Sequence, residues 1–121
     1  MGFAIIGAAF AFLSVAFGAF GAHVLAGQLS TQMLGVYNTG AQYEMYHALA
    51  LLAVGIFLHL NVGGKSMRVA GWLFTIGIVL FSGSLYVLSM TGATALGALT
   101  PVGGLLLLAG WVSFALALAK K

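Results

Sequence analysis

The sequence predicts an all-α integral membrane protein, a four-helix transmembrane bundle of up-down topology with a short interfacial helix after the first span. Of its 121 residues, 63% are hydrophobic and 4% are charged. A soluble domain carries roughly 25% charged residues, so this chain lacks the charge to cover a surface in water. At about 20 residues per span, the length accommodates four helices with short loops and no second domain. We therefore treat residues 1–121 as a single membrane domain.

The apolar runs place the four predicted spans at residues 3–25, 41–60, 69–90 and 100–119. In the first span, Ser14, Gly18 and Ala22 recur every four residues, a spacing of small residues that lets another helix approach closely. Pro101 stands in the first turn of the last span, where its missing N–H costs nothing. The short connectors between the second, third and fourth spans favour antiparallel neighbours.

The polar connector, residues 26–40, predicts the interfacial helix. Leu29, Met33, Val36 and Tyr37 fall at helical spacing, and Ser30 stands where a helix cap is expected. Such an amphipathic helix would lie in the plane of the membrane surface. The alternative is that these residues extend the second span, against which only Gly40 argues.

The cations predict the orientation. Lys65 and Arg68 lie between the second and third spans, whereas Lys120 and Lys121 follow the fourth. The positive-inside rule therefore puts both termini and the middle turn in the cytoplasm and the connector 26–40 on the extracytoplasmic side. A net charge of +3 spread over two places makes no basic patch for nucleic acid.

Glu44, the only acidic residue of the chain, marks the candidate site. An ionisable residue inside a span is a functional candidate because its burial is costly. His47 follows three residues later and shares its helix face. The predicted orientation gathers polar side chains from three spans in the outer layer, and the candidate binding residues are His23, Gln42, Tyr43, Glu44, His47, Ser82, Ser84 and Tyr86.

These residues permit functional and structural interpretations. Glu44 and His47 could form a proton-accepting or cation-binding pair, or a hydrogen bond that ties the second span to a neighbour. Adding His23 would give three ligands for a transition metal, but their loose spacing is weak evidence, and we predict no metal and no cofactor. Ser82 and Ser84, with Gly83 between them, could line a small polar pocket or allow close helix packing.

The sequence contains no catalytic motif that we recognise. Gly64-Lys65-Ser66 resembles the end of a phosphate loop, but that pattern needs a glycine where His59 stands. The absence of cysteine excludes thiolate chemistry. A nucleophile triad needs an acid, and Glu44 is the only one in the chain. Because no catalytic set is recognisable, we predict that the protein is not an enzyme.

Four segments together carry a resemblance to a known family. They are GAFGAH at residues 18–23, QY at 42–43 with YHAL at 46–49, FSGSLY at 81–86, and TPVGG at 100–104 with GW at 110–111. They resemble the small bacterial membrane family called domain of unknown function 423, with a distant similarity to eukaryotic transmembrane protein 256. The resemblance covers the whole chain and implies a four-span protein of the bacterial inner membrane. It implies no established activity.

Three functions stay open at this point. The first is a non-enzymatic accessory module that assembles with itself or with a larger membrane complex. The second is a small transporter or channel subunit for a proton, cation or small solute, using Glu44, His47 and His23. The third is binding of a lipid or isoprenoid, which predicts an apolar groove beneath the polar layer. Membrane lipids are the expected partners in every case.

Overall fold

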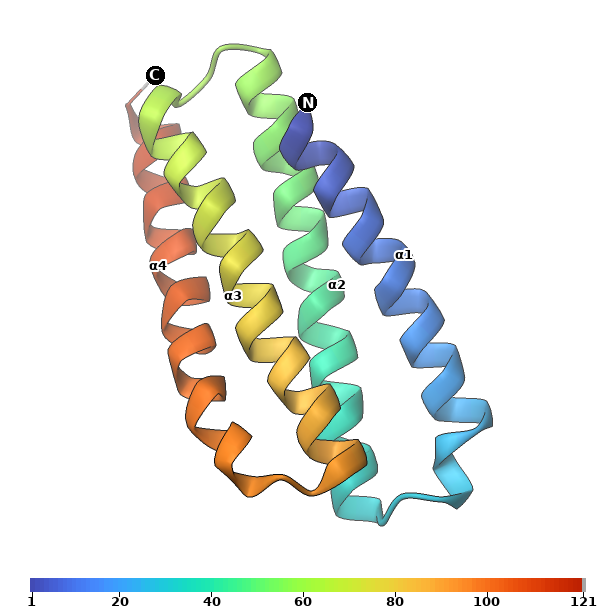
Figure 1. The fold of residues 1–121 in the computed structure, drawn as a ribbon. Coiled ribbons are helices and arrows are strands. Elements are labelled where there is room, and N and C mark those ends of the chain that lie inside the picture. The colour runs from blue at the N-terminus through green and yellow to red at the C-terminus, as the bar shows by residue number, and fades with distance from the viewer. Residues whose placement is uncertain (121) are drawn as a thin grey trace.

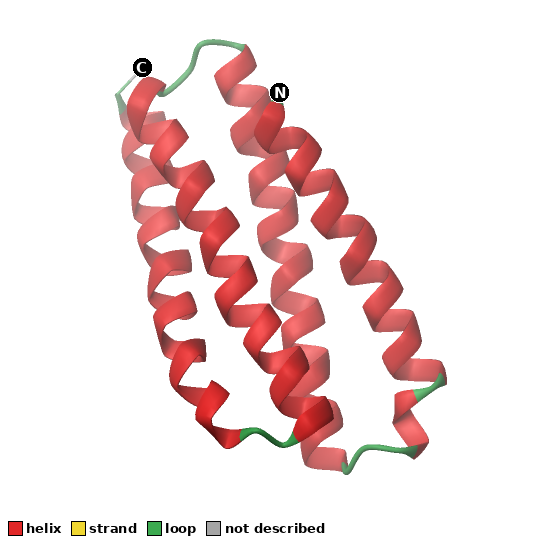
Figure 2. Cartoon of the chain, viewed as in Figure 1, coloured by secondary structure: helices red, strands yellow, loops and turns green. Residues whose placement is uncertain are grey.

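The computed structural model describes residues 1–120, and this part of the chain is helical, with no strand (Figure 2). The long helices are α1 (Gly2–His23), α2 (Thr31–His59), α3 (Gly64–Thr91) and α4 (Leu99–Ala119). Two short 3₁₀ helices, Leu25–Gly27 and Thr94–Ala98, lie in the connectors. The helices run alternately up and down, so the predicted all-α up-down bundle is confirmed (Figure 1).

All four helices are long and apolar enough to cross a membrane. The chain starts at the same end of the bundle as the turn between α2 and α3, and α4 finishes at that end too (Figure 1). The two connectors without Lys or Arg lie at the opposite end. The cations therefore gather at one end of the molecule, which we call the cationic end.

Helix α2 begins ten residues earlier than the predicted second span. Ser30 caps it as expected, since its Oγ accepts a hydrogen bond from the Met33 N–H at 3.1 Å. The helix then continues through Gly40 without a break, so the separate interfacial helix is not formed and the alternative, an extended second span, is what we observe. Gly40 is a packing residue, because a Cβ there would lie 3.3 Å from both Leu85 and Tyr86.

The early start of α2 changes the place of Glu44 along its helix. The 29 residues of α2 span about 44 Å, whereas the hydrocarbon core of a bilayer is about 30 Å thick. The predicted boundary at residue 41 implied that Glu44 lies close to the end of its helix. In the structure it lies near the middle of α2.

The helices pack in chain order, α1 on α2, α2 on α3 and α3 on α4. Helices α1 and α4 lie on opposite sides of the central pair, so the bundle is open (Figure 1). In the apolar stretch that could span the membrane, only 17% of the α1 span and 22% of the last span are buried, against 44% for α2 and for α3. Most of the surface of α1 and α4 is therefore left to lipid or to other proteins.

The contact face of α1 differs from the predicted ridge. Gly7, Ser14 and Gly21 are buried, whereas Gly18 meets no neighbour and Ala22 is exposed. Seven residues separate each buried position from the next, which is the period that keeps one helix seam against its partner in left-handed packing. The Ser14 hydroxyl donates to the Ala41 carbonyl at 2.7 Å and fastens this seam to α2.

A core of buried apolar side chains fills the half of the bundle nearest the cationic end. Leu51 and Val54 of α2, Met67 and Phe74 of α3, and Ala117 of α4 have no exposed surface. These side chains close the space between α2, α3 and α4, and the polar candidates lie beyond this core.

Candidate functional site

Glu44 is held by one aromatic donor from another helix. The Tyr86 hydroxyl of α3 donates to Glu44 Oε1 at 2.6 Å. Both side chains are buried, with 3% of Glu44 and 8% of Tyr86 exposed. The Tyr86 ring packs in turn against Tyr37 and Phe17, whose ring centroids lie 5.2 and 4.9 Å away. Helices α1, α2 and α3 therefore all contribute to fixing the carboxylate.

His47 lies almost one turn further along α2, where its side chain meets α4. The Trp111 indole N–H donates to His47 Nε2 at 3.0 Å, and His47 Nδ1 lies 2.8 Å from the Tyr43 carbonyl oxygen. An indole N–H can only donate, so Nε2 accepts with its lone pair and Nδ1 carries the ring proton. The two contacts hold His47 as a neutral imidazole in a single tautomer.

These contacts rule out the Glu44–His47 pair as an interacting unit. No hydrogen bond or ion pair joins the two side chains within residues 1–120; Glu44 is bonded to α3 and His47 to α4. Their spacing puts them on neighbouring positions of one helix face, but each has a better partner on a different helix. For His47, the hydrogen bond to Trp111 ties α2 to α4, as the structural interpretation would require.

Glu44 lies at the base of a crevice between α1 and α3. The crevice has a volume of about 200 Å³. Its walls are apolar, with Phe10, Leu13 and Phe17 from α1 and Ile78 and Val79 from α3. Glu44, Ser82 and Tyr86 border it beside Gly83, with their polar atoms almost wholly buried. Leu13 and Val79 are exposed at its edge, so the crevice opens sideways on the apolar surface of the bundle.

Two polar groups at the base of the crevice have capacity for a further hydrogen bond. The Ser82 side chain is 1% exposed, and within the described chain its hydroxyl has no partner. The bond from Tyr86 to Oε1 is the single side-chain hydrogen bond found for the Glu44 carboxylate over residues 1–120. A buried hydroxyl without a partner costs about 1–3 kcal/mol, so a bound polar group would stabilise this arrangement.

The other predicted site residues lie elsewhere. Ser84 contacts α4, with its Oγ 2.6 Å from Thr100 Oγ1 and donating to the Phe81 carbonyl at 2.9 Å. Gln42 and Tyr43 are exposed on α2, and His23 is exposed at the end of α1. The eight residues therefore do not form one cluster; Glu44, Ser82 and Tyr86 share the crevice, and the rest do not.

No metal centre is found in the described part of the chain, residues 1–120. Groups of three His, Asp or Glu side chains near enough to hold an ion are absent there. The three-ligand arrangement considered for His23, Glu44 and His47 is not formed, because His23 lies at the helix end and His47 is engaged by Trp111.

Sequence reasoning missed the partners that give the site its shape. Trp111 gave no sign that it would donate to His47, and Phe10, Leu13, Ile78 and Val79 gave no signal in an apolar sequence. The one available clue was the FSGSLY segment, in which Gly83 leaves room beside two hydroxyls.

A family model described as "Protein of unknown function (DUF423)" matches residues 17–104. UPF0382 membrane protein YwdK of Bacillus subtilis is 48% identical to the chain, over 98% of the chain and 96% of the relative. UPF0382 membrane protein SH2409 of Staphylococcus haemolyticus is 47% identical, over 91% and 88% respectively. UPF0382 membrane protein SAB0533 of Staphylococcus aureus is 45% identical, over 98% and 95%. No solved structure matches the chain.

Proposed function

Because the chain belongs to the DUF423 family of bacterial membrane proteins, for which the family description gives no activity, we propose a function from its geometry. The protein is a non-enzymatic membrane module that binds an amphiphile in the crevice between α1 and α3. The polar group of the amphiphile bonds to Glu44 and Ser82, and its apolar part lies along the crevice walls.

The observation that carries this proposal is the unpartnered Ser82 hydroxyl beside Glu44 at the base of an apolar crevice. A carboxylate accepts hydrogen bonds, and a serine hydroxyl both accepts and donates. The matching head group is therefore a donor such as a hydroxyl or an amine. A phosphate or carboxylate head would meet Glu44 as a like charge.

The size of the crevice limits the ligand. A volume of about 200 Å³ lies below the 300–1,000 Å³ typical of pockets that enclose a drug-sized molecule. The crevice accommodates a small head group with the first part of one chain, and the remainder would lie in the surrounding lipid. A membrane alcohol of the lipid or isoprenoid class has this form.

The packing below the crevice supports binding in preference to transport. An ion or solute would have to pass the core formed by Leu51, Val54 and Phe74, which have no exposed surface. His47, the next ionisable group along α2, has both ring nitrogens engaged and is not positioned to relay a proton.

The contacts of the polar residues also support a non-enzymatic role. Glu44 is bonded to Tyr86, and His47 bonds to Trp111 instead of a serine or threonine hydroxyl. No hydrogen bond joins Ser82 to Glu44 or to His47 within the described residues, so Ser82 is not paired with a base that would make it a nucleophile.

The proposed location is the bacterial inner membrane, with the termini in the cytoplasm and the crevice toward the outer leaflet. Support comes from the cationic end, which carries Lys65, Arg68 and Lys120. Helix α4 is about 32 Å long, close to the hydrocarbon thickness, and its second residue, Thr100, contacts Ser84. The level of Ser84 along the bundle then marks the outer boundary of the hydrocarbon layer, and Ser82 lies just inside that boundary.

The uncovered faces of α1 and α4 support a second part of the proposal, assembly with a second copy or with a larger membrane complex. These helices do not pack on each other, so each has a long apolar surface outside the bundle. Light scattering of the detergent-purified protein, corrected for bound detergent, measures the number of chains; a single chain at all concentrations would contradict self-assembly.

Mass spectrometry of co-purifying molecules tests the binding function. Gly83 lines the crevice, and a Cβ there would meet nothing within 4 Å, so Gly83→Leu is chosen to place a bulky side chain at the crevice from an open backbone position. Gly35→Leu is the matched control, at an exposed and equally open position of α2. We expect Gly83→Leu to lose at least 90% of a bound amphiphile that wild type and Gly35→Leu retain. Equal retention by all three proteins would contradict the proposal.

A further inference from the structure

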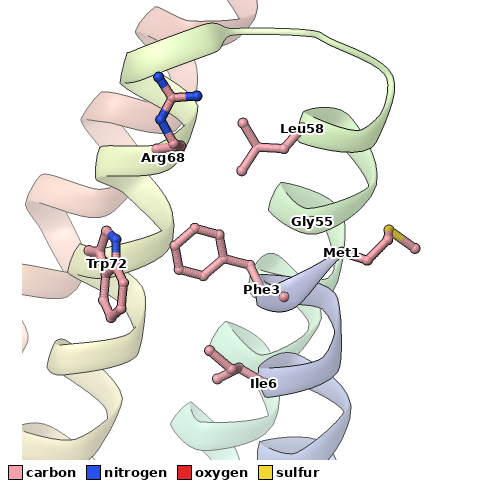
Figure 3. A pocket seen from close by; sticks show the side chains of 8 residues that line it. Met1, Phe3, Ile6, Gly55, Leu58, Arg68 and Trp72 are labelled. Atoms are coloured by element: carbon pink, nitrogen blue, oxygen red, sulfur yellow. The ribbon is translucent and has the colours of Figure 1, made fainter.

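A second groove between α1 and α3 lies at the cationic end, and we propose that it binds an anionic phospholipid. Its volume is about 340 Å³ (Figure 3). Phe3, Ile6, Leu58 and Trp72 give it an apolar lining, and Arg68 is the one charged side chain that lines it. The inference does not depend on the crevice at Glu44, because the two sites share no residue.

The groove exists because α1 is close to α2 and is held away from α3. A Cβ on Gly55 would overlap the backbone and the methyl group of Ala4, so the two helices approach closely there. Phe3 instead reaches across to α3, where its ring meets Trp72 edge-on at a centroid distance of 5.4 Å (Figure 3). The spacing of α1 from α3 leaves an opening along the side of the bundle.

Arg68 lies one helical turn from Trp72, at the end of the groove nearest the turn between α2 and α3 (Figure 3). Its side chain is exposed, and within residues 1–120 it has no hydrogen bond or ion pair. Glu44, the only acidic side chain of the chain, is bonded to Tyr86 and lies 14 residues, about 21 Å, along α2 from Leu58. No acidic side chain of the chain therefore pairs with Arg68, and its exposed guanidinium has room for an external anion.

The order of the groups selects the ligand class. A guanidinium binds phosphate oxygens through two parallel hydrogen bonds, and the residues beyond it in the groove are apolar. A soluble phosphate would use the Arg68 end alone, whereas a phospholipid would place its phosphate there and an acyl chain beside Trp72, Phe3 and Ile6. Basic pockets between transmembrane helices on the cytoplasmic side bind anionic head groups in this way.

Lipid exchange into the purified protein tests this site. The protein is incubated in mixed micelles containing equal amounts of dioleoylphosphatidylglycerol and dioleoylphosphatidylcholine, and native mass spectrometry counts the lipids that remain bound. Wild type is expected to prefer phosphatidylglycerol. Arg68→Gln should lower the ratio of bound phosphatidylglycerol to bound phosphatidylcholine about fivefold, the factor that corresponds to about 1 kcal/mol for one basic residue. Leu58→Trp, which fills the groove and keeps the charge, should lower the binding of phosphatidylglycerol as well.

Lys120→Gln is the matched control, since Lys120 lies at the same end but donates to Ser66 Oγ at 2.9 Å and does not line the groove. It should keep the preference to within a factor of two. Equal losses in Arg68→Gln and Lys120→Gln would indicate diffuse charge and overturn the site. Unchanged binding in Leu58→Trp, with its thermal unfolding unchanged, would also overturn it.

Discussion

Glu44 and His47, two buried ionisable side chains of α2, each accept a hydrogen bond from one aromatic donor. Tyr86 donates to Glu44, and Trp111 donates to His47. Removing a donor leaves a buried acceptor unsatisfied, which costs more than the net contribution of the hydrogen bond itself. The two aromatic residues therefore matter for stability beyond their apolar contacts.

Tyr86→Phe should lower the free energy of unfolding by about 1–3 kcal/mol, because it removes the donor to Glu44 and keeps the ring. Tyr43→Phe is the control, since the Tyr43 side chain is 40% exposed, and it should change stability by less than about 0.5 kcal/mol. Denaturant unfolding in detergent measures both. Equal effects of the two substitutions would contradict the role given to the Tyr86 hydroxyl.

A double-mutant cycle tests whether Glu44 and His47 act separately. Because they bond to different helices, Glu44→Gln and His47→Ala should have nearly additive effects, within about 0.5 kcal/mol. The cycle of His47→Ala with Trp111→Phe should instead show coupling of about 0.5–3 kcal/mol, since these residues touch. Strong coupling in the first cycle and none in the second would mean that the pairing is wrong.

The sequence identified Glu44, His47 and Tyr86 as candidates, but it did not show which side chains would bond to one another. A lone acid in an apolar chain is visible without a structure, and the spacing of three residues suggested that the two would interact. Tyr86 and Trp111 lie 42 and 64 residues from the groups they bond, so finding them requires knowing how α2, α3 and α4 pack.

At the scale of helices, backbone contact at glycines sets the arrangement. Gly55 meets the backbone of Ala4 between α1 and α2, and Gly103 meets the backbone of Phe81 between α3 and α4. These contacts leave no room for a methyl group. The two outer helices are therefore held to the central pair at defined points.

Gly55→Ala should lower the free energy of unfolding by about 1–3 kcal/mol, because the added methyl forces α1 away from α2. Gly18→Ala, on the open face of α1, should be neutral or stabilising by up to about 1 kcal/mol, since alanine favours the helix. Thermal unfolding compares them. A destabilised Gly18→Ala beside an unchanged Gly55→Ala would refute the assignment of the packed face.

Gly40 and Gly18 show why glycine was a poor guide to helix boundaries and seams here. Gly40 was the reason to expect a break before the second span, yet it allows close packing of α2 on Leu85 and Tyr86. Gly18 fitted a four-residue ridge, but the seam follows a seven-residue spacing instead. Both outcomes depend on the neighbouring helix, which the local sequence does not specify.

At the scale of the molecule, the two sites on the α1–α3 side differ in charge. The crevice has the acidic Glu44 and lies in the half away from the cationic end, whereas the groove has Arg68 at that end. The number, approximate place and alternating direction of the helices followed from hydropathy. The open order, with α1 and α4 apart, did not, because the apolar surfaces of all four helices look alike in sequence.

The proposed orientation is testable because the chain contains no cysteine. With single cysteines at exposed positions, a membrane-impermeant maleimide added to intact cells should label Thr94→Cys and not Lys65→Cys. Lysis before labelling should make Lys65→Cys reactive, which controls for accessibility. Labelling of Lys65→Cys alone in intact cells would place the cationic end outside.

The most direct test of the central claim is an experimental structure of the protein extracted with its native lipids. The account predicts density in the crevice between α1 and α3, with a polar atom within hydrogen-bond distance of both the Glu44 carboxylate and Ser82 Oγ. An empty or collapsed crevice, with Ser82 bonded to a carbonyl of its own helix, would contradict it and leave Glu44 as a structural link between α2 and α3.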